Sequence, residues 1–443
     1  FSLSVTAWAA DGVHEFVLDN GLKLIVKEDH RAPVVVSQVW YKVGSSYEYS
    51  GITGVSHVLE HMMFKGTESL APGEFSRIIA AEGGEENAFT GRDYTAYFQS
   101  LQRDRLETSF RLEADRMRNL TLPEEEFAKE VQVVMEERRL RTEDNPQALT
   151  YERFNAAAFL ASPYRHPVIG WMNDLQHMEV EDLRDWYRLW YAPNNATVVV
   201  AGDVQPEEVL ALANQYFGPL KPESVEGPKP RREPPQLGEQ RIKVHAPAQL
   251  PYVLLGYKAP VVGQSEVDWE PYALEVLAGI LDGGDSARLT KELVRGSGVA
   301  ASAGAGYGAY SRLDTLLVLD GTPAPGHTVA EVEHALRDQI RRLRDEPVSP
   351  EELARVKAQV VAHDVYERDS VFYQAMQIGK LETLGLDWRL IDEYVPRIRA
   401  VTAEQVQAVA RKYLLDDQLT VAVLEPVTGA AVAGQQGSAA NGG

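Results

Sequence analysis

The sequence predicts an α+β fold made of two similar halves, each an antiparallel sheet flanked by helices. Each half begins with strand-like sequence, HEFVLDNGLKLIVKED from residue 14 and RIKVHAPAQLPYVLLGYKAP from residue 241. Each half ends with a capped amphipathic helix, a short turn and a β-branched strand, in residues 178–204 and 400–426. A segment rich in Pro, Gly and charge, residues 221–240, separates the halves. This weak internal duplication indicates two copies of one α+β unit.

Five segments follow from this pattern along the chain. A hairpin turn is expected at Asn20-Gly21, close to the start of the first half. The small and polar end of the chain, GAAVAGQQGSAANGG, is predicted to be disordered. The expected segments are a signal-peptide remnant at 1–9, an N-terminal domain at 10–220, a linker at 221–240, a C-terminal domain at 241–428 and a disordered tail at 429–443.

The first residues resemble the end of a targeting signal. The apolar start FSLSVT leads into Ala7-Trp8-Ala9, which resembles the small-x-small cleavage signature of an exported protein. The sequence therefore predicts a periplasmic protein, and a frayed N-terminus of a cytoplasmic protein is the alternative interpretation.

Composition excludes several classes of function. The chain has 443 residues, 44% of them hydrophobic, which is enough for two or more buried cores. Its net charge of -21 opposes contact with nucleic-acid phosphates, so no nucleic-acid partner is expected. It has no run of eighteen apolar residues, so no membrane span is expected. The absence of Cys excludes thiolate metal sites and cysteine nucleophiles.

The stretch HVLEH, residues 57–61, is the first candidate for chemistry. On a helix, His57 and His61 lie about 40° apart, and Glu60 lies about 60° to the other side of His57. Two neutral imidazoles at i and i+4 can bind one Zn²⁺, which leaves the carboxylate free to move a proton. This order of residues is that of the inverzincins. The alternative is the solvated face of an amphipathic helix.

A third ligand is expected on the predicted helix that follows Pro123. With Val134 at the centre of its apolar stripe, Glu136 faces outward at about 200°. Glu130 at about -40° and Glu137 at about -60° lie on the edge of the buried face, where an isolated carboxylate is unfavourable. A metal with its histidines would satisfy such a carboxylate, and a salt bridge to Arg or Lys is the alternative for Glu137.

These motifs together resemble the pitrilysin/insulinase family of zinc peptidases, over most of residues 13–425. The segment EVQVVMEE follows HVLEH at the family's spacing and is similar to its Glu-x6-Glu helix. The resemblance implies one zinc ion per chain held by His57, His61 and Glu137, with Glu130 orienting the site behind them. It implies that Glu60 is the general base, and that each chain of this short type is half of a clamshell.

Further segments extend the resemblance to substrate binding. GGEENAFTGRDYTAYF is similar to the family segment that carries an edge strand near the zinc, which implies that Asn87 and Ala88 pair with extended peptide substrates. LAGILDGGDSARLTKELVRGSGVA is similar to a Gly-rich turn and helix in the family's second half. There Arg295 matches a substrate-contacting Arg, but Ala301 stands where the family has Tyr. Tyr307 and Tyr310 are six and nine positions away and are poor substitutes.

The missing Tyr and the short chain imply a partner. We expect a zinc-dependent metalloendopeptidase that is the catalytic subunit of a heterodimer, with a homologous sister subunit supplying the Arg/Tyr pair. Alternatives are a homodimeric processing peptidase, a scaffold subunit without catalysis, and a module that captures peptides without cutting them. The resemblance names no particular substrate.

Overall fold

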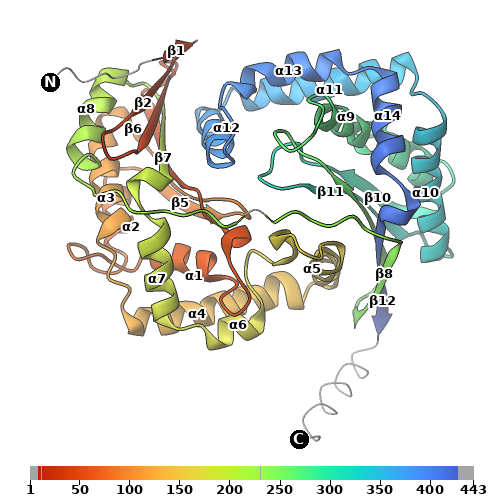
Figure 1. Ribbon diagram of the computed structural model, residues 1–443, viewed down its shortest axis with the longest axis horizontal. Helices are drawn as coiled ribbons and strands as arrows, with labels where there is room; N and C mark the ends of the chain where they lie inside the picture. Colours follow the sequence, from red (N-terminus) through yellow and green to blue (C-terminus); the bar gives the residue numbers. More distant parts are fainter. Residues whose placement is uncertain (1–7, 11, 230, 428–443) are drawn as a thin grey trace, which may run out of the picture. The chain divides into compact units, whose positions relative to one another are not determined.

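The computed structural model describes residues 8–10, 12–229 and 231–427 of the chain. The chain divides into two compact units, each assembled from three segments (Figure 1). Unit 1 consists of Phe1–Glu137, His166–Pro230 and Val365–Ile391, and unit 2 of Arg138–Arg165, Arg231–Asp364 and Asp392–Gly443. The predicted signal remnant at residues 1–7 and the tail at 428–443 lie outside the described residues.

Within the described residues, unit 1 contains a seven-stranded sheet of order β1-β2-β3-β7-β4-β6-β5. The strand β7 lies parallel to β3 and antiparallel to β4, and β5 is an edge strand. The hairpin predicted at Asn20-Gly21 joins β2 to β3, with Gly21 at a φ of 86°. The strands are β1 (Trp8–Ala10), β2 (Val13–Val17), β3 (Lys23–Glu28), β4 (Val34–Tyr41), β5 (Glu85–Thr90), β6 (Thr95–Gln102) and β7 (Ala196–Gly202).

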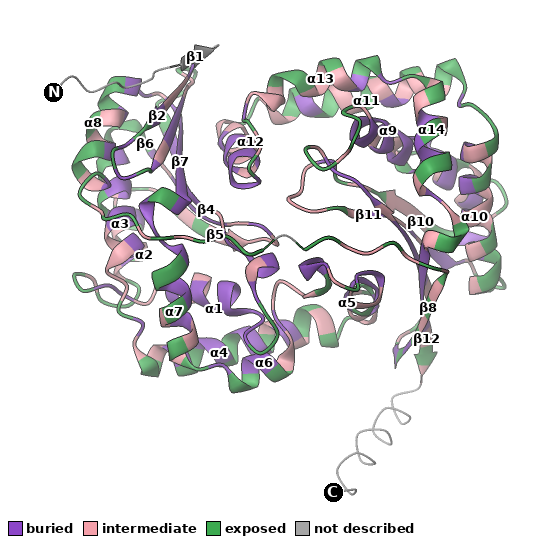
Figure 2. Cartoon of the chain, in the orientation of Figure 1, coloured by how far each residue is buried: buried purple, intermediate pink, exposed green. Residues whose placement is uncertain are grey.

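Helices cover both faces of this sheet, as the burial of every residue of β7 requires. Val198 and Val200 face one core, which also holds the apolar side of the helix carrying HVLEH, and Val199 faces another. Figure 2 shows β7 buried along its length. The helices are α1 (Val55–Met62), α2 (Glu74–Ala81), α3 (Leu106–Arg118), α4 (Glu124–Arg138), α6 (Met172–His177), α7 (Val180–Trp190), α8 (Pro206–Tyr216) and α12 (Val371–Thr383).

The helix α12 comes from late in the sequence but belongs to unit 1. It packs on the second face of the sheet through Gly379, where an added Cβ would lie 2.1 Å from Nε1 of Trp40. Lys23 of β3 donates to Glu382 at 2.7 Å. The predicted division into 10–220 and 241–428 therefore differs from the compact units, because α12 buries apolar surface against a distant sheet.

Unit 2 contains, in the part of the chain described, a five-stranded sheet of order β10-β11-β9-β12-β8. Helix α5 lies on one face of it, with the Phe154 ring against Gly256 of β9, where a Cβ would clash at 2.3 Å. Its strands are β8 (Gln240–Pro247), β9 (Tyr252–Ala259), β10 (Ala300–Gly306), β11 (Thr315–Pro323) and β12 (Leu419–Val427), and its helices are α5 (Pro146–Ala158), α9 (Glu270–Asp282), α10 (Val329–Asp345), α11 (Pro350–Glu367), α13 (Leu390–Ala400) and α14 (Ala403–Tyr413). Two of these helices, α11 and α13, cross the boundary between the units.

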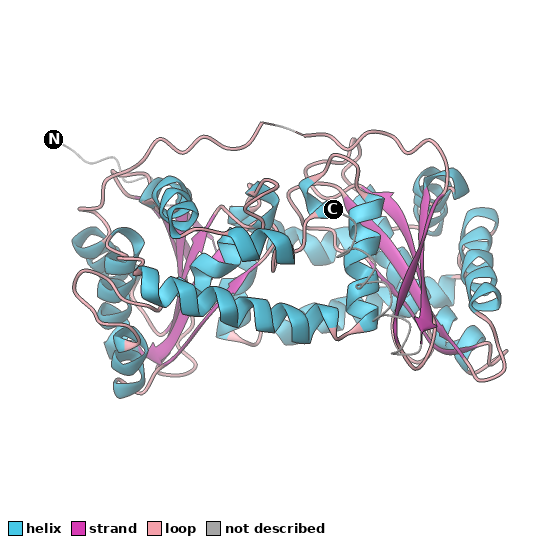
Figure 3. Ribbon diagram, turned by 90° about the horizontal axis from the view of Figure 1, so that it is seen from below, coloured by secondary structure: helices cyan, strands magenta, loops and turns pink. Residues whose placement is uncertain are grey.

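The two sheets share one topology, which confirms the predicted duplication. In unit 1 the order β3-β7-β4-β6-β5 corresponds to β8-β12-β9-β11-β10 in unit 2. In unit 1, β7 lies parallel to β3 and antiparallel to β4. In unit 2, β12 lies parallel to β8 and antiparallel to β9 in the same way. The sheets are therefore mixed and not purely antiparallel, because a strand that returns after helices can insert parallel to its neighbour. Figure 3 shows helices beside each sheet.

No helix among the described residues has the length and hydropathy needed to cross a membrane.

A charged pair lies in the core of unit 1, next to the aromatic side chains beneath α1. Arg116 and Glu113 of α3 are both fully buried and joined by hydrogen bonds of 2.8 and 2.5 Å. The Arg116 guanidinium also lies over the rings of Phe75 and Tyr97, at 4.2 and 4.5 Å from their centroids. Gln99 donates to the same carboxylate at 2.6 Å.

Arg116→Met should lower the free energy of unfolding of unit 1 by about 3–5 kcal/mol, because it leaves the Glu113 carboxylate buried without its cation. Urea unfolding followed by Trp fluorescence measures this, since six of the seven Trp residues belong to unit 1. The double variant Glu113→Leu/Arg116→Met should recover part of the loss. A loss below about 1 kcal/mol in the single variant would contradict the prediction.

Candidate metal centre

The helix α1 begins in a tightly packed turn. Gly54 adopts a φ of 92°, and a Cβ at this position would lie 2.7 Å from the Ile169 carbonyl oxygen. The buried Glu48 carboxylate accepts hydrogen bonds from the N–H groups of Gly54 and Ser56, at 2.7 and 2.9 Å. It thereby satisfies donors that the first turn of a helix leaves open. Sequence reasoning did not identify Glu48, because it lies outside the helix that it caps.

Burial raises the pKa of Glu48 from its ordinary value of 4.5 to about 7, although the two backbone N–H groups oppose the shift. The folded state thus binds this proton more tightly than the unfolded state. The protonated Glu48 carboxyl makes its full contribution to the stability of unit 1 below pH 4.5, and this contribution is lost as the pH rises towards 7. This pKa shift corresponds to about 3 kcal/mol in the free energy of unfolding.

We therefore expect unit 1 to become less stable between pH 5 and pH 8, and Glu48→Gln to reduce this pH dependence because glutamine does not ionise. Thermal unfolding of both proteins at several pH values, followed by Trp fluorescence, measures the difference. Glu136→Gln, which changes an exposed carboxyl, is the matched control. Equal pH dependence in Glu48→Gln and the unchanged protein would refute the prediction.

The two histidines of α1 lie on one side of the helix and point in the same direction. Their ring centroids are 4.9 Å apart, with the planes at 83°. The side chains of His57 and His61 are only 11% and 22% exposed, so they do not form a solvated helix face. The opposite side of α1 is buried in the core of unit 1 through Val55, Val58, Leu59 and Met62.

Glu137 of α4 meets both imidazoles. Its Oε1 lies 3.8 Å from Nε2 of His57, and its Oε2 lies 3.6 Å from Nε2 of His61. One ligand atom from each residue falls within 4.8 Å of the other two, and in the described chain these three residues are the group that could hold a metal. Ligands about 2.0–2.1 Å from zinc lie roughly 3.3 Å apart across a tetrahedron, so a bound ion would draw the Glu137 oxygens and the two Nε2 atoms closer together than the 3.6 and 3.8 Å seen here.

The helical geometry of α4 separates Glu137 from its neighbours. Glu136 is exposed, as predicted, and Glu137 is half-buried. The next residue, Arg138, is held by Glu152 at 2.7 Å. The structure thus brings together His57, His61 and Glu137 from two helices far apart in sequence.

Glu130 of α4 contacts the second ring nitrogen of His61. Its Oε2 lies 3.1 Å from Nδ1 of His61, and its Oε1 accepts from Lys65 at 2.7 Å. A carboxylate on the second ring nitrogen fixes the tautomer that leaves Nε2 available to a metal. Sequence reasoning missed Lys65, although its position four residues after His61, just beyond the end of α1, is the signal that would have found it.

Glu130→Gln should weaken metal binding by about 10- to 100-fold, because the amide orients His61 less strongly than the carboxylate does. Competition against a chelator of known affinity measures the change. Glu136→Gln on the exposed side of the same helix is the control and should bind metal normally. Equal affinity in the two variants would rule out this role for Glu130.

Glu60 follows His57 and precedes His61 in the sequence of α1, and its side chain is partly exposed. Its Oε2 accepts a hydrogen bond from the Thr90 hydroxyl at 2.5 Å. Thr90 is the last residue of β5 and was not among the predicted site residues. A residue of β5 thus orients the Glu60 carboxylate, and Glu60 lies on the same helix as the candidate ligands His57 and His61.

The predicted substrate-binding residues Asn87 and Ala88 lie on the edge strand β5. Asn87 is exposed, and its side-chain oxygen accepts from the backbone N–H of Ala88 at 2.8 Å. Ala88 packs against the core that contains the apolar side of α1. The edge of the sheet therefore lies beside the helix that carries HVLEH.

Arg295 and Ala301 lie in unit 2. Arg295 is exposed and pairs with Asp285 at 3.0 Å, and Ala301 is exposed on the edge strand β10. The Tyr307 hydroxyl donates to the carbonyl of Pro260, and Tyr310 packs in the same core. Both tyrosines are used in packing, which agrees with their rejection as substitutes for the missing Tyr.

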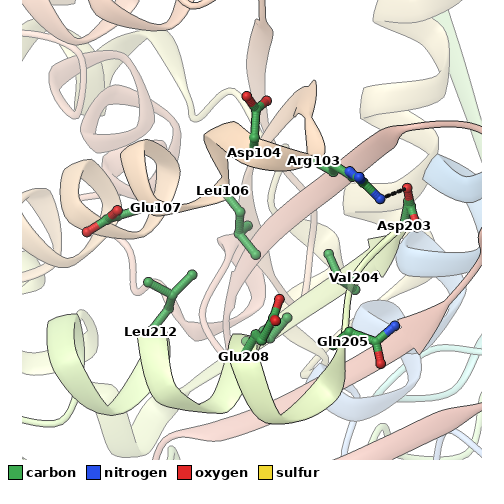
Figure 4. Close-up of a pocket in the computed structure, with 10 residues that line it drawn as sticks. Arg103, Asp104, Leu106, Glu107, Asp203, Val204, Gln205, Glu208 and Leu212 are labelled. Atoms are coloured by element: carbon green, nitrogen blue, oxygen red, sulfur yellow. Dashed lines mark hydrogen bonds and ion pairs between the residues drawn. The ribbon is translucent and has the colours of Figure 1, made fainter.

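A hollow of about 500 Å³ in unit 1 lies apart from these residues (Figure 4). Arg103 and Asp203 form an ion pair of 2.8 Å on its wall. None of the predicted site residues lines it. The lining residues are Arg103, Asp104, Leu106, Glu107, Asp203, Val204, Gln205, Glu208, Val209 and Leu212.

Comparison with known proteins shows relatives along most of the chain. The zinc protease PqqE of Helicobacter pylori is 32% identical over 418 residues, which cover 93% of this chain and 93% of that protein. The uncharacterized zinc protease YmxG of Bacillus subtilis is 25% identical over 414 residues, covering 94% and 98%.

Solved structures share the fold. A protease from Helicobacter pylori superposes with a TM-score of 0.89 at 30% identity, covering 94% of this chain and 100% of that one. The periplasmic protease PqqL from Escherichia coli superposes with a TM-score of 0.80 at 18% identity, covering 99% of this chain but 51% of that one. The second likeness concerns the fold alone.

Two family models match the chain in succession. Residues 23–170 match insulinase (peptidase family M16), and residues 177–360 match the peptidase M16 inactive domain. The first match contains His57, His61 and Glu137, and the second lies mostly in unit 2. The chain belongs to the insulinase family of zinc proteases, peptidase family M16.

Proposed function

We propose that this chain is a zinc-dependent metalloendopeptidase that hydrolyses peptide bonds in extended peptides. The convergence of His57, His61 and Glu137 within 4.8 Å of one another is the observation that carries the proposal. Two imidazoles and one carboxylate form a three-ligand set typical of catalytic zinc. A purely structural zinc site in a protein has four protein ligands.

Each residue of the site has a separate task. His57, His61 and Glu137 would hold a zinc ion, which when bound would supply Lewis-acid chemistry towards water and a peptide carbonyl. Glu60 accepts the proton of the attacking water and then delivers it to the leaving amine. Glu130 holds His61 in its ligating tautomer, and Lys65 balances the charge of Glu130.

Substrates bind as an added strand on β5. An edge strand offers backbone donors and acceptors to an extended peptide, which gives affinity with little demand on side-chain sequence. The exposed Asn87 and the backbone of Ala88 lie on this edge. The pairing selects unfolded segments over folded proteins.

The active enzyme is a heterodimer with a homologous sister chain that supplies an Arg/Tyr pair. Ala301 replaces the expected Tyr, and the nearby Tyr307 and Tyr310 are packed in the core of unit 2. The longer PqqL chain, only 51% of which is covered by this one, supports the idea that one chain is half of an assembly. A homodimer is the alternative outcome of the test.

Copurification with a tagged chain from the native host, followed by digestion of a peptide mixture and mass spectrometry, tests the proposal. We expect zinc-dependent cleavage by the two-chain complex and little by this chain alone. Full activity of the isolated chain would overturn the heterodimer but not the peptidase. Absence of cleavage by both zinc-loaded preparations would overturn the peptidase.

We also propose that the protein acts in the periplasm. The signal-like start supports this, as does the fold shared with a protease described as periplasmic. Separation of periplasm from cytoplasm, followed by immunodetection, tests the location, and detection in the cytoplasm alone would overturn it.

A further inference from the structure

Thr90 connects the edge strand of unit 1 to the carboxylate between the two histidines. Its hydroxyl donates to Oε2 of Glu60 at 2.5 Å, and both side chains are partly buried. A hydrogen bond to an ionised group is roughly twice as strong as one between neutral groups. Thr90 therefore restrains the position of the Glu60 carboxylate.

The direction of the Thr90 hydroxyl is set by β5. A β-branched side chain has restricted rotation about χ1, and alternate residues of a strand face the same side. Ala88 shares that side and packs in the core that contains Val58 and Leu59 of α1. Thr90 thus faces α1 because of its register on β5.

The turn that follows Thr90 is tied to the start of α1 by a second route. The N–H of Gly91 donates to the Tyr94 carbonyl at 2.8 Å, which closes the β5–β6 hairpin. The N–H of Ser46 donates to the Arg92 carbonyl at 2.7 Å. Two residues further on, Glu48 binds the first turn of α1. The hairpin is therefore linked to both the beginning and the middle of α1.

We infer that Thr90 is a positioning residue that orients Glu60, and that it couples the strand on which substrate docks to the base that acts on substrate. The inference rests on the proposed function. A peptide paired with β5 shares its strand with Thr90, so the place where the peptide binds and the direction of the base are fixed by one element. Preorganisation of this kind acts on the chemical step and not on substrate binding.

The test compares Thr90→Val, which keeps the shape but removes the hydroxyl, with Thr90→Ser, which keeps the hydroxyl. Both are assayed as the zinc-loaded complex, with zinc content and unfolding temperature measured alongside. A hydrogen bond to a charged group contributes about 1.5–3 kcal/mol, so kcat should fall roughly 10- to 100-fold in Thr90→Val. KM and zinc content should stay within about 2-fold, and Thr90→Ser should retain most of kcat.

A second arm separates positioning from general damage to the fold. In the Glu60→Gln background, adding Thr90→Val should cause little further loss, because the two residues act as one unit. Losses that multiply, or an unchanged kcat in Thr90→Val, would overturn the inference while the peptidase assignment stands. Absence of cleavage by the unchanged complex would overturn both, which distinguishes the two failures.

Discussion

Glu60→Gln is expected to abolish most peptide hydrolysis while the protein keeps its zinc. Glutamine has nearly the same shape but accepts no proton at neutral pH, so proton transfer from water to the leaving amine is lost. General acid–base catalysis contributes about 10²–10⁴-fold, and the drop should appear in kcat. Cleavage of an unstructured peptide, followed by mass spectrometry, measures it.

Three controls make this result specific to Glu60. Zinc content should remain at one ion per chain, because Glu60 is not among the three residues whose ligand atoms converge. The unfolding temperature should change little, since the carboxylate is partly exposed. Glu136→Gln alters an exposed carboxyl on α4 and should retain full activity. Unchanged turnover in Glu60→Gln would refute its role as general base.

Glu137→Gln is expected to abolish high-affinity zinc binding. The amide oxygen carries no negative charge and competes poorly for a divalent cation that the carboxylate would hold between His57 and His61. The loss should exceed the 10- to 100-fold expected for Glu130→Gln, because a direct ligand is removed. Elemental analysis after dialysis against a chelator measures the metal that remains.

Unfolding temperature gives an independent measure of the same change. A ligand that binds only the folded state raises stability in proportion to the logarithm of its concentration. Added zinc should therefore raise the unfolding temperature of the unchanged protein and of Glu136→Gln, but not of Glu137→Gln. Equal responses in both variants would show that the helical argument chose the wrong glutamate.

The sequence predicted the candidate ligands well because the relevant geometry is local. The spacing of His57 and His61 places both rings on one side of any helix, and the apolar stripe of α4 distinguishes Glu137 from Glu136. The structure has both features: the rings lie 4.9 Å apart, and Glu136 is exposed while Glu137 is half-buried. Helical periodicity determines such relations before any tertiary contact forms.

The partners of these residues were harder to predict. Thr90, Lys65 and Glu48 contact Glu60, Glu130 and the first turn of α1 respectively. Thr90 and Glu48 lie outside the helix that they support, so no periodic pattern connects them to it. Their identification required the positions of the strand and loop against α1.

The domain boundaries could also be predicted only in part from the sequence. The repeated sequence pattern revealed two similar halves, and the two sheets share one strand order. Residues 138–165 nevertheless belong to unit 2, and residues 365–391 belong to unit 1. A prediction from sequence places each segment in the same domain as its neighbours along the chain. In the structure, α5 and α12 bury apolar surface against sheets distant in sequence.

The sequence by itself determined the α+β class, the duplication, the family resemblance and the ligand-bearing faces of two helices, since each follows from spacing along one continuous segment. Only the tertiary structure decided that those faces meet, that Glu130 and Lys65 lie behind His61, and that Thr90 holds Glu60. These contacts, including that of Lys65 with Glu130, join residues 30 to 80 positions apart along the chain. Such contacts depend on how the helices and strands pack together, which short-range patterns do not encode.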